Sequence, residues 1–133
     1  MILVDSVGWI DFLSDGPLAS QYEKHLHSMS EVVVPTIVLY EVYKKFRREQ
    51  NEKVALMVFV KMQMGQLIHL TEQLALQAAD VALQFRLSMV DAIVYATALQ
   101  EKAKVVTSDK DLKDLPEVIY YQKSSYKAKK EKF

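Results

Sequence analysis

The chain has 133 residues, half of them hydrophobic and a quarter charged, which fits one domain with a buried core and excludes an intrinsically disordered protein. It contains no cysteine, which excludes disulfides and thiolate metal sites and favours a reducing cytoplasm, and no apolar run reaches the roughly 18 residues that span a membrane. The formal net charge is zero, but residues 1–120 hold 12 Lys and Arg against 16 Asp and Glu, whereas residues 121–133 hold 5 against 1.

The first half of the chain alternates short apolar runs with amphipathic segments. In chain order we expect a strand at 2–4, a helix from residue 6 that the turn at 15–17 breaks, a helix at 18–29, a strand at 31–35 and a helix at 36–49. The first strand meets Asp5 before an export signal develops, so we expect a cytoplasmic protein. Pro35 ends the second strand, and its fixed φ suits the start of the helix that carries Glu41.

The second half continues this alternation. In chain order we expect a methionine-rich helix at 51–64, a strand at 67–70, a helix at 72–87, a helix that Ser88 caps, a strand at 105–107, a polar turn at 108–111 and an edge strand at 118–121. Gly65 is expected to end the methionine-rich helix in a left-handed conformation. Met57, Met62 and Met64 are expected to pack mainly in the core, although methionines also suit an adaptable binding surface.

Apolar strands that alternate with helices predict an α/β fold of three layers, with a central, mostly parallel sheet and helices on both faces. We expect one domain over residues 1–121 and a basic, flexible tail over residues 122–133. In such folds the ligand site lies beyond the carboxyl ends of the strands, where the winding direction switches. Asp5 and Asp109 are expected at that edge.

Asp91 is the most informative residue, because it stands in the apolar run at 89–99. A buried carboxylate without a partner costs several kcal/mol, so a positive group should lie nearby. The helix N-terminus at Ser88 is expected to favour the ionised form of Asp91. We expect Asp5, Glu41 and Asp109 to join Asp91 in one acidic cluster.

Such a cluster needs a cation, because two carboxylates ~5 Å apart repel by about 3 kcal/mol at an effective dielectric of 20. Oxygen ligands without Cys or clustered His suit Mg²⁺ or Mn²⁺, and one or two such ions would activate a water for phosphodiester hydrolysis. Taken singly, the acids have ordinary explanations: Asp5 as a helix cap, Glu41 as a partner of Lys44 or Lys45, and Asp109 and Asp111 as turn residues.

The order and surroundings of these acids resemble the PIN-domain ribonucleases, and more narrowly the VapC toxins of type II toxin–antitoxin systems. The resemblance extends to about Tyr121 and rests on four pieces: Ile-Leu-Val-Asp5-Ser6, Glu41 in the helix after Pro35-Thr36, the run from Asp91 to Leu99, and Val106-Thr107-Ser108-Asp109-Lys110-Asp111-Leu112. Two positions depart from the family pattern. Val7 stands where a small polar residue is common, and Leu112 replaces a usual Phe.

The resemblance implies an Mg²⁺- or Mn²⁺-dependent endoribonuclease whose catalytic and metal-binding residues are Asp5, Glu41, Asp91 and Asp109. Ser6, Thr107 and Asp111 match further family positions and would orient a ligand carboxylate or a water. It also implies an RNA substrate, a cognate antitoxin that blocks the active-site groove, and a homodimer. The basic residues that suit RNA phosphates are Lys44, Lys45, Arg47, Arg48, Arg86 and those of the tail. Trp9 and the tyrosines are expected in the core or in interfaces rather than as platforms for stacking bases.

Other enzyme classes fit less well. A haloacid-dehalogenase-like phosphatase needs a second acid two residues after the first, where this chain has Val7, and a response-regulator receiver needs paired acids near the first strand. The remaining alternatives are a non-catalytic PIN-like module that binds RNA or protein without cutting it, and a housekeeping RNA-processing nuclease.

Overall fold

The structure, a computed structural model, describes residues 1–123, and residues 124–133, most of the expected basic tail, lie outside the described residues. The helices are α1 (Ser6–Leu13), α2 (Ala19–Leu26), α3 (Thr36–Glu49), α4 (Glu52–Gln63), α5 (Glu72–Phe85) and α6 (Met89–Glu101), with short 3₁₀ helices η1 (Met29–Glu31) and η2 (Lys110–Leu112). The strands are β1 (Ile2–Val4), β2 (Val32–Pro35), β3 (Gln66–Ile68), β4 (Lys104–Thr107) and β5 (Val118–Tyr120).

The five strands form one sheet in the order β3-β2-β1-β4-β5, and every neighbouring pair is parallel. β1 is central, because Leu3 pairs in register with Val33 of β2 and with Val105 of β4. The chain winds outward from β1 through β2 to β3 and then crosses to β4 and β5. The winding direction therefore switches between β1 and β4, beside Asp5 and Asp109.

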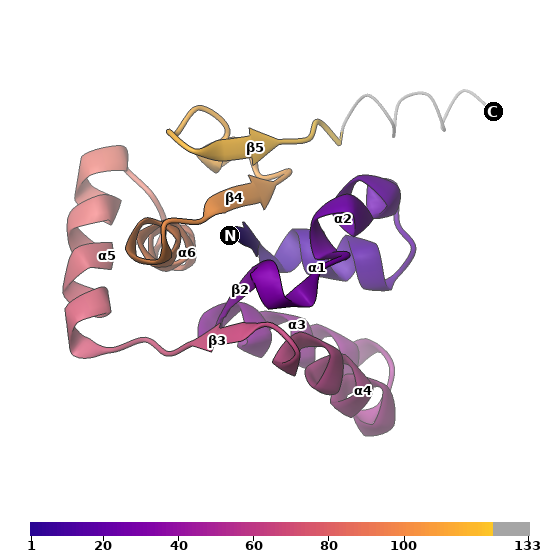
Figure 1. Ribbon diagram of the computed structural model, residues 1–133. Helices are drawn as coiled ribbons and strands as arrows, with labels where there is room; N and C mark the ends of the chain where they lie inside the picture. The colour runs from indigo at the N-terminus through magenta and orange to yellow at the C-terminus, as the bar shows by residue number, and fades with distance from the viewer. Residues whose placement is uncertain (124–133) are drawn as a thin grey trace.

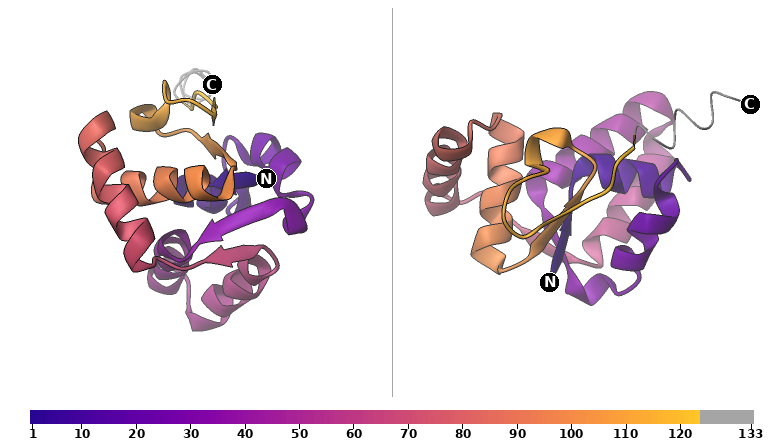
Figure 2. Two further views of the ribbon diagram at one scale, coloured as in Figure 1. Left: turned by 60° about the vertical axis from the view of Figure 1, so that its left-hand side comes forward. Right: turned by 90° about the horizontal axis from the view of Figure 1, so that it is seen from above.

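Helices cover both faces of this sheet. Figure 1 shows α5 and α6 on one side of the strands and α1 and α2 on the other, and Figure 2 shows the same arrangement from two further directions. α3 and α4 pack against each other as a hairpin next to β3. The predicted three-layer α/β/α architecture is confirmed.

The strands that lead into the carboxyl edge are buried on both faces. The side chains of Val4, Val33 and Val106 are fully buried, as expected for parallel strands made of continuous apolar runs. Trp9 and Tyr22, which belong to the helices on one side of the sheet, are also fully buried, as expected for the aromatic residues. The sheet and its helices thus form a rigid support for the loops at this edge.

α6 contributes seven consecutive buried residues, Ala92–Ala98, because it packs against α5 and against strands of the sheet. Asp91 stands just before this buried stretch, so packing of the whole helix fixes its position. Within residues 1–123 no single helix is long and apolar enough to cross a membrane, and α5 and α6 pass such a test only as a pair bent by 112°.

The expected left-handed cap at Gly65 is wrong. No glycine among the described residues has a positive φ, and Met64 ends α4 in a right-handed conformation. The lack of room for a side chain explains the glycine instead, because a Cβ at Gly65 would lie 2.9 Å from the carbonyl oxygen of Val32 and 3.0 Å from Val34 Cγ2. Left-handed residues do end α5 and α6, at Arg86 and Lys102.

Several boundaries also differ from expectation, those of α2 and β3 among them. α2 ends at Leu26 rather than at residue 29, because the separate 3₁₀ turn η1 buries Met29 and leads the chain into β2. β3 covers residues 66–68 rather than 67–70, because its partner β2 ends at Pro35, opposite Ile68.

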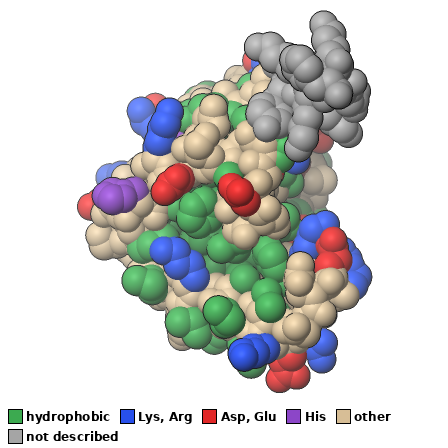
Figure 3. Space-filling model, turned by 90° about the vertical axis from the view of Figure 1, so that its right-hand side faces the viewer, with side chains coloured by type: hydrophobic (Ala, Val, Ile, Leu, Met, Phe, Trp, Pro, Cys, Tyr) green, Lys and Arg blue, Asp and Glu red, His purple; other side chains and the backbone are tan. Residues whose placement is uncertain are grey.

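The methionines of α4 divide between the core and the surface. Met62 is fully buried, whereas Met57 and Met64 are 64% and 62% exposed, so only Met62 has the expected core role. Leu56 and Val60 of the same helix are exposed as well. Figure 3 faces the side of the molecule on which α4 lies and shows hydrophobic side chains gathered among charged ones.

Candidate metal centre

Four acidic side chains converge at the carboxyl edge of the sheet. Asp5 follows β1 and Asp109 follows β4, and these strands are neighbours. Helices that connect parallel strands run back against the strand direction, so α3 and α6 begin at the same edge and bring in Glu41 and Asp91. The four acids line one pocket of about 280 Å³, together with Ser6 and Val7. The structure thus brings the four expected residues together, and their role as metal ligands remains a prediction.

Asp5 is the most enclosed of the four acids, with 6% of its surface exposed. It caps α1, because its Oδ1 accepts a hydrogen bond from the backbone N–H of Gly8 at 3.0 Å. Its Oδ2 accepts a hydrogen bond from the hydroxyl of Thr107. Burial, aided by the charges of Asp109 and Glu41, raises the pKa of Asp5 to about 6 in spite of the lowering effect of these two hydrogen bonds. Asp5 does cap a helix, as the ordinary explanation of this residue expected. The hydrogen bond of the cap nevertheless lowers the pKa of Asp5 less than burial raises it.

Gly8 makes this cap possible by leaving room for α1 to approach its neighbours. A Cβ at Gly8 would lie 2.5 Å from Val4 Cγ1 and 2.5 Å from Tyr22 Cε1. Any larger residue would therefore push the start of α1 away from the carboxylate that it caps. The sequence pattern gave no sign of this requirement.

Thr107 connects two of the acids across neighbouring strands. Its side chain is fully buried, and its hydroxyl donates to Asp5 while accepting from the backbone N–H of Asp109 at 2.9 Å. The hydroxyl therefore fixes the end of β4 relative to the end of β1. Thr107 thus orients the carboxylate of Asp5, and whether that carboxylate binds a metal stays a prediction.

Asp91 is the third residue of α6 and is partly buried. Ser88 caps the helix, because its Oγ accepts from the backbone N–H of Asp91 at 3.4 Å. Burial is the largest cause, and together with the nearby Asp109, Asp111 and Asp5 it raises the pKa of Asp91 to about 7. The expected preference for the ionised form at the helix N-terminus is therefore outweighed, because burial and neighbouring negative charges act more strongly than the helix dipole.

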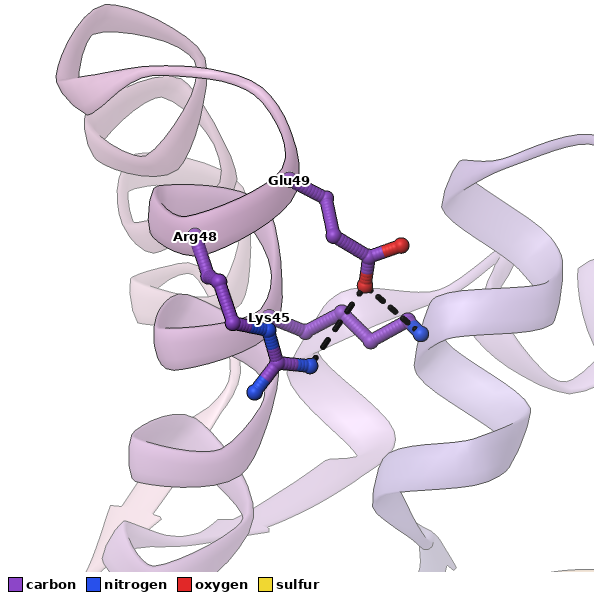
Figure 4. Close-up of polar contacts among 3 residues, drawn as sticks. All are labelled: Lys45, Arg48 and Glu49. Carbon is purple, nitrogen blue, oxygen red and sulfur yellow. Dashed lines mark ion pairs between the residues drawn. The ribbon is translucent and has the colours of Figure 1, made fainter.

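No lysine or arginine within residues 1–123 forms an ion pair with Asp5, Glu41, Asp91 or Asp109. The positive charge expected near Asp91 is thus not supplied by an ion pair with a lysine or arginine of this part of the chain. Figure 4 shows that Lys45 turns instead to Glu49, with 2.7 Å between Nζ and Oε2, and that Arg48 contacts the same oxygen at 3.6 Å.

Glu41 is therefore not the surface ion-pair partner that its neighbours in α3 suggested. Its Oε1 is buried and has no hydrogen-bond partner among the described residues. A buried carboxylate oxygen without a partner carries a full desolvation cost. Glu41 and Asp5 line the same pocket, so the carboxylate of Glu41 lies beside any ligand that binds there.

Asp111 takes a larger part in the cluster than the sequence indicated. One carboxylate oxygen each from Asp91, Asp109 and Asp111 lie within 4.8 Å of one another, a spacing that suits a shared metal ion. Asp109 and Asp111 are held in this arrangement by η2, where the Oδ1 of Asp109 accepts from the backbone N–H of Asp111 at 2.9 Å. From the sequence, Asp111 could be an ordinary turn residue, and the resemblance to the PIN-domain ribonucleases implied that it orients a ligand carboxylate or a water.

The expected RNA-binding residues do not all lie together. Lys44, Lys45 and Arg48 line a second hollow, which contains Ser6 and Glu41 as well and so adjoins the acidic pocket. Arg86 is exposed at the end of α5 and lines neither hollow.

Several solved structures share this fold. A toxin–antitoxin complex from Klebsiella pneumoniae matches with a TM-score of 0.77 at 22% identity, covering 90% of this chain and 96% of that one. VapC20 of Mycobacterium tuberculosis, a toxin that cleaves the sarcin–ricin loop, matches with a TM-score of 0.66 at 15% identity, covering 97% and 95%. A DNA-bound VapBC from Salmonella typhimurium gives 0.68 at 12% identity, covering 90% and 96%. No curated protein matches the chain in sequence.

At such identities these structures establish the fold. The family follows from the sequence itself, because the model of the PIN domain matches residues 2–118, which includes all the acids of the pocket. Asp5, Glu41, Asp91 and Asp109 therefore all belong to the part of the chain that matches the family. This chain belongs to the PIN domain family.

Proposed function

We propose that this protein is a metal-dependent endoribonuclease in which Asp5, Glu41, Asp91 and Asp109 hold Mg²⁺ or Mn²⁺ and hydrolyse RNA phosphodiester bonds. The observation that carries the proposal is a pocket of four carboxylates that no lysine or arginine in residues 1–123 neutralises. Such a pocket is tolerable in its ionised state only with a cation inside it.

The residues fit a hard divalent cation. The donors are carboxylate oxygens alone, which Mg²⁺ and Mn²⁺ prefer. Glu41, whose buried Oε1 has no hydrogen-bond partner among the described residues, would supply one ligand through its carboxylate, and the raised pKa values of Asp5 and Asp91 indicate charge that a cation would stabilise. Asp111 is close enough to Asp91 and Asp109 to hold a ligand water or a further ion.

The chain's own groups set the geometry for hydrolysis. Thr107 and the N–H of Gly8 fix both oxygens of Asp5, so that this carboxylate keeps one orientation toward the pocket. Ser88 fixes the first turn of α6 and with it Asp91. Val7 and Val94 supply apolar parts of the wall, which reduce the access of bulk water. When bound, the divalent ion lowers the pKa of a water and stabilises negative charge on the leaving oxygen.

The biological role that we propose is the toxin of a toxin–antitoxin pair. The similarity to VapC20 and to the two toxin–antitoxin complexes supports this role, as does the resemblance of the motifs to VapC toxins. A cognate antitoxin, an RNA substrate and a homodimer are the partners that follow from it. A small open reading frame immediately upstream, coding for an acidic or DNA-binding protein, would support the antitoxin.

The test is cleavage of structured RNA by the purified protein, freed of any partner, in Mg²⁺, Mn²⁺ or EDTA. We expect cleavage with either ion, none in EDTA, and none by folded Asp5→Asn and Asp91→Asn variants. Asp80→Asn, at an exposed position of α5, is the matched control and should cleave normally. Equal cleavage in EDTA would reject the mechanism. No cleavage of any RNA, with the metal still bound, would favour a non-catalytic binding module.

A further inference from the structure

A second hollow of about 230 Å³ adjoins the acidic pocket and differs from it in charge. The two share Ser6 and Glu41 in their linings, so they lie side by side. Beyond Glu41 the second hollow is lined by Tyr40 and by three cationic residues of α3, Lys44, Lys45 and Arg48. A polyanion that reaches the acidic pocket therefore meets positive charge directly beside it.

The spacing along α3 produces this change of charge. Tyr40, Lys44 and Arg48 are four residues apart, which places them in one row along a helix. Glu41 and Lys45 form the adjacent row by the same spacing. The cations thus begin one turn after the acid that lines the first pocket.

The three cations are not equivalent. Lys45 and Arg48 share the carboxylate of Glu49, at 2.7 and 3.6 Å (Figure 4). Lys44 forms no ion pair within residues 1–123, and its Nζ lies 5.4 Å from the centre of the Tyr40 ring. Lys44 is therefore the cation of this hollow that remains available to a phosphate.

Tyr40 does not lie in the core, because 57% of its surface is exposed. An exposed ring at the edge of a cationic groove is the arrangement with which proteins hold single-stranded nucleic acid, since bases stack on the ring while cations hold the backbone. With the ammonium group of Lys44 beside it, one nucleotide can meet both groups.

We propose that Tyr40 and Lys44 form a nucleotide subsite next to the cleavage centre, a proposal that rests on the proposed nuclease function. The base of an unpaired RNA nucleotide stacks on Tyr40, and a flanking phosphate binds Lys44. RNA is favoured over a protein partner because Lys44, Lys45 and Arg48 gather positive charge directly beside the acids, where the backbone phosphates of a bound strand would lie. Stacking tolerates any base, so the subsite selects unpaired nucleotides rather than a sequence.

The first test compares kcat and KM for RNA in the wild type, Tyr40→Leu and Tyr40→Phe. We expect KM to rise about tenfold in Tyr40→Leu with little change in kcat, and to stay near wild type in Tyr40→Phe, which keeps the ring. Lys44→Gln should make binding less dependent on salt by about one ion, while Lys53→Gln, at an exposed position of α4, should not. An unchanged KM in Tyr40→Leu, or an equal loss in Tyr40→Phe, would overturn the subsite.

A binding measurement separates failure of the subsite from failure of the nuclease proposal. Short RNA that contains 2-aminopurine should lose fluorescence on binding the wild type in EDTA, and Tyr40→Leu should abolish this quenching. Quenching without cleavage in metal would reject the nuclease while supporting the subsite. Cleavage with unchanged quenching in Tyr40→Leu would reject the subsite alone. Dissociation of a dimer by Tyr40→Leu, with RNA binding intact, would assign the surface to a second copy and also overturn it.

Discussion

Replacing Asp91 by Asn should stabilise the metal-free protein at alkaline pH, although it removes a residue of the proposed active site. In the wild type, burial and the nearby Asp109 contribute to raising the pKa of Asp91 to about 7. Above pH 7 the side chain is therefore ionised in surroundings that disfavour its charge, which lowers the stability of the folded protein. Asn keeps the shape of the side chain without the charge. Its amide also has hydrogens to donate to the neighbouring carboxylates.

The size of the effect follows from the pKa. A rise from about 4 to about 7 corresponds to about 4 kcal/mol at ~1.4 kcal/mol per unit. Asp91 is only partly buried, so solvent screening reduces this to roughly 1–2 kcal/mol at pH 8. Such a gain raises Tm by roughly 3–8 °C in a domain of this size.

The stabilisation expected from Asp91→Asn depends on pH. Between pH 4 and 7 the native state of the wild type binds more protons at Asp91 than the unfolded state does, so its stability falls as pH rises through this range. The advantage of Asp91→Asn should therefore be complete above pH 7 and vanish near pH 4. Mg²⁺ should reverse the order at pH 8, because at 100 times its Kd it adds about 2.7 kcal/mol to the wild type alone.

Chemical denaturation of both proteins in EDTA at pH 4 and pH 8, and in Mg²⁺ at pH 8, measures these differences. Asp80→Asn serves as the control and should match the wild type throughout. If Asp91→Asn destabilised the protein at pH 8 in EDTA, Asp91 would have a cationic partner and the reasoning would be wrong.

Four further changes test separate parts of the account. Mn²⁺ affinity should fall as pH drops from 7 to 5, because Asp91 and Asp5, with pKa values of about 7 and about 6, must lose protons to bind it; titration calorimetry in two buffers would also detect the released protons. Glu41→Gln should weaken Mn²⁺ binding by about tenfold or more without loss of stability in EDTA, since an amide nitrogen replaces a ligand oxygen; unchanged affinity would remove Glu41 from the site. Thr107→Val should cost about 1–3 kcal/mol in urea denaturation, because buried polar groups of Asp5 and Asp109 lose their partner; no loss would mean that water replaces the hydroxyl. Gly65→Ala should cost about 1–3 kcal/mol through its contact with the carbonyl oxygen of Val32, and a stabilised variant would refute the steric explanation of this glycine.

The fold was predictable because its strands are continuous apolar runs. Residues 3–4, 32–35 and 105–106 are buried within a parallel sheet, so these stretches are continuously apolar in the sequence. Their carboxyl ends must share one edge, which places Asp5 next to Asp109. This topology let residues more than one hundred positions apart be assigned to one pocket.

What the sequence did not reveal depends on tertiary distances. Gly65 resembles a helix cap, and only the approach of β2 shows why a Cβ is excluded. The helix N-terminus favours an ionised Asp91, yet burial and neighbouring acids reverse the direction of its pKa. In α3, Lys45 forms its ion pair with Glu49, so it forms none with Glu41.

The central claim is that the carboxyl-edge acids together hold a divalent cation. Anomalous diffraction from crystals of the wild type grown with Mn²⁺ tests it most directly. We predict a manganese peak among the carboxylates of Asp5, Glu41, Asp91 and Asp109, which disappears in Asp91→Asn crystals. A pocket without manganese at saturating concentration, or a peak confined to another part of the surface, would contradict the account.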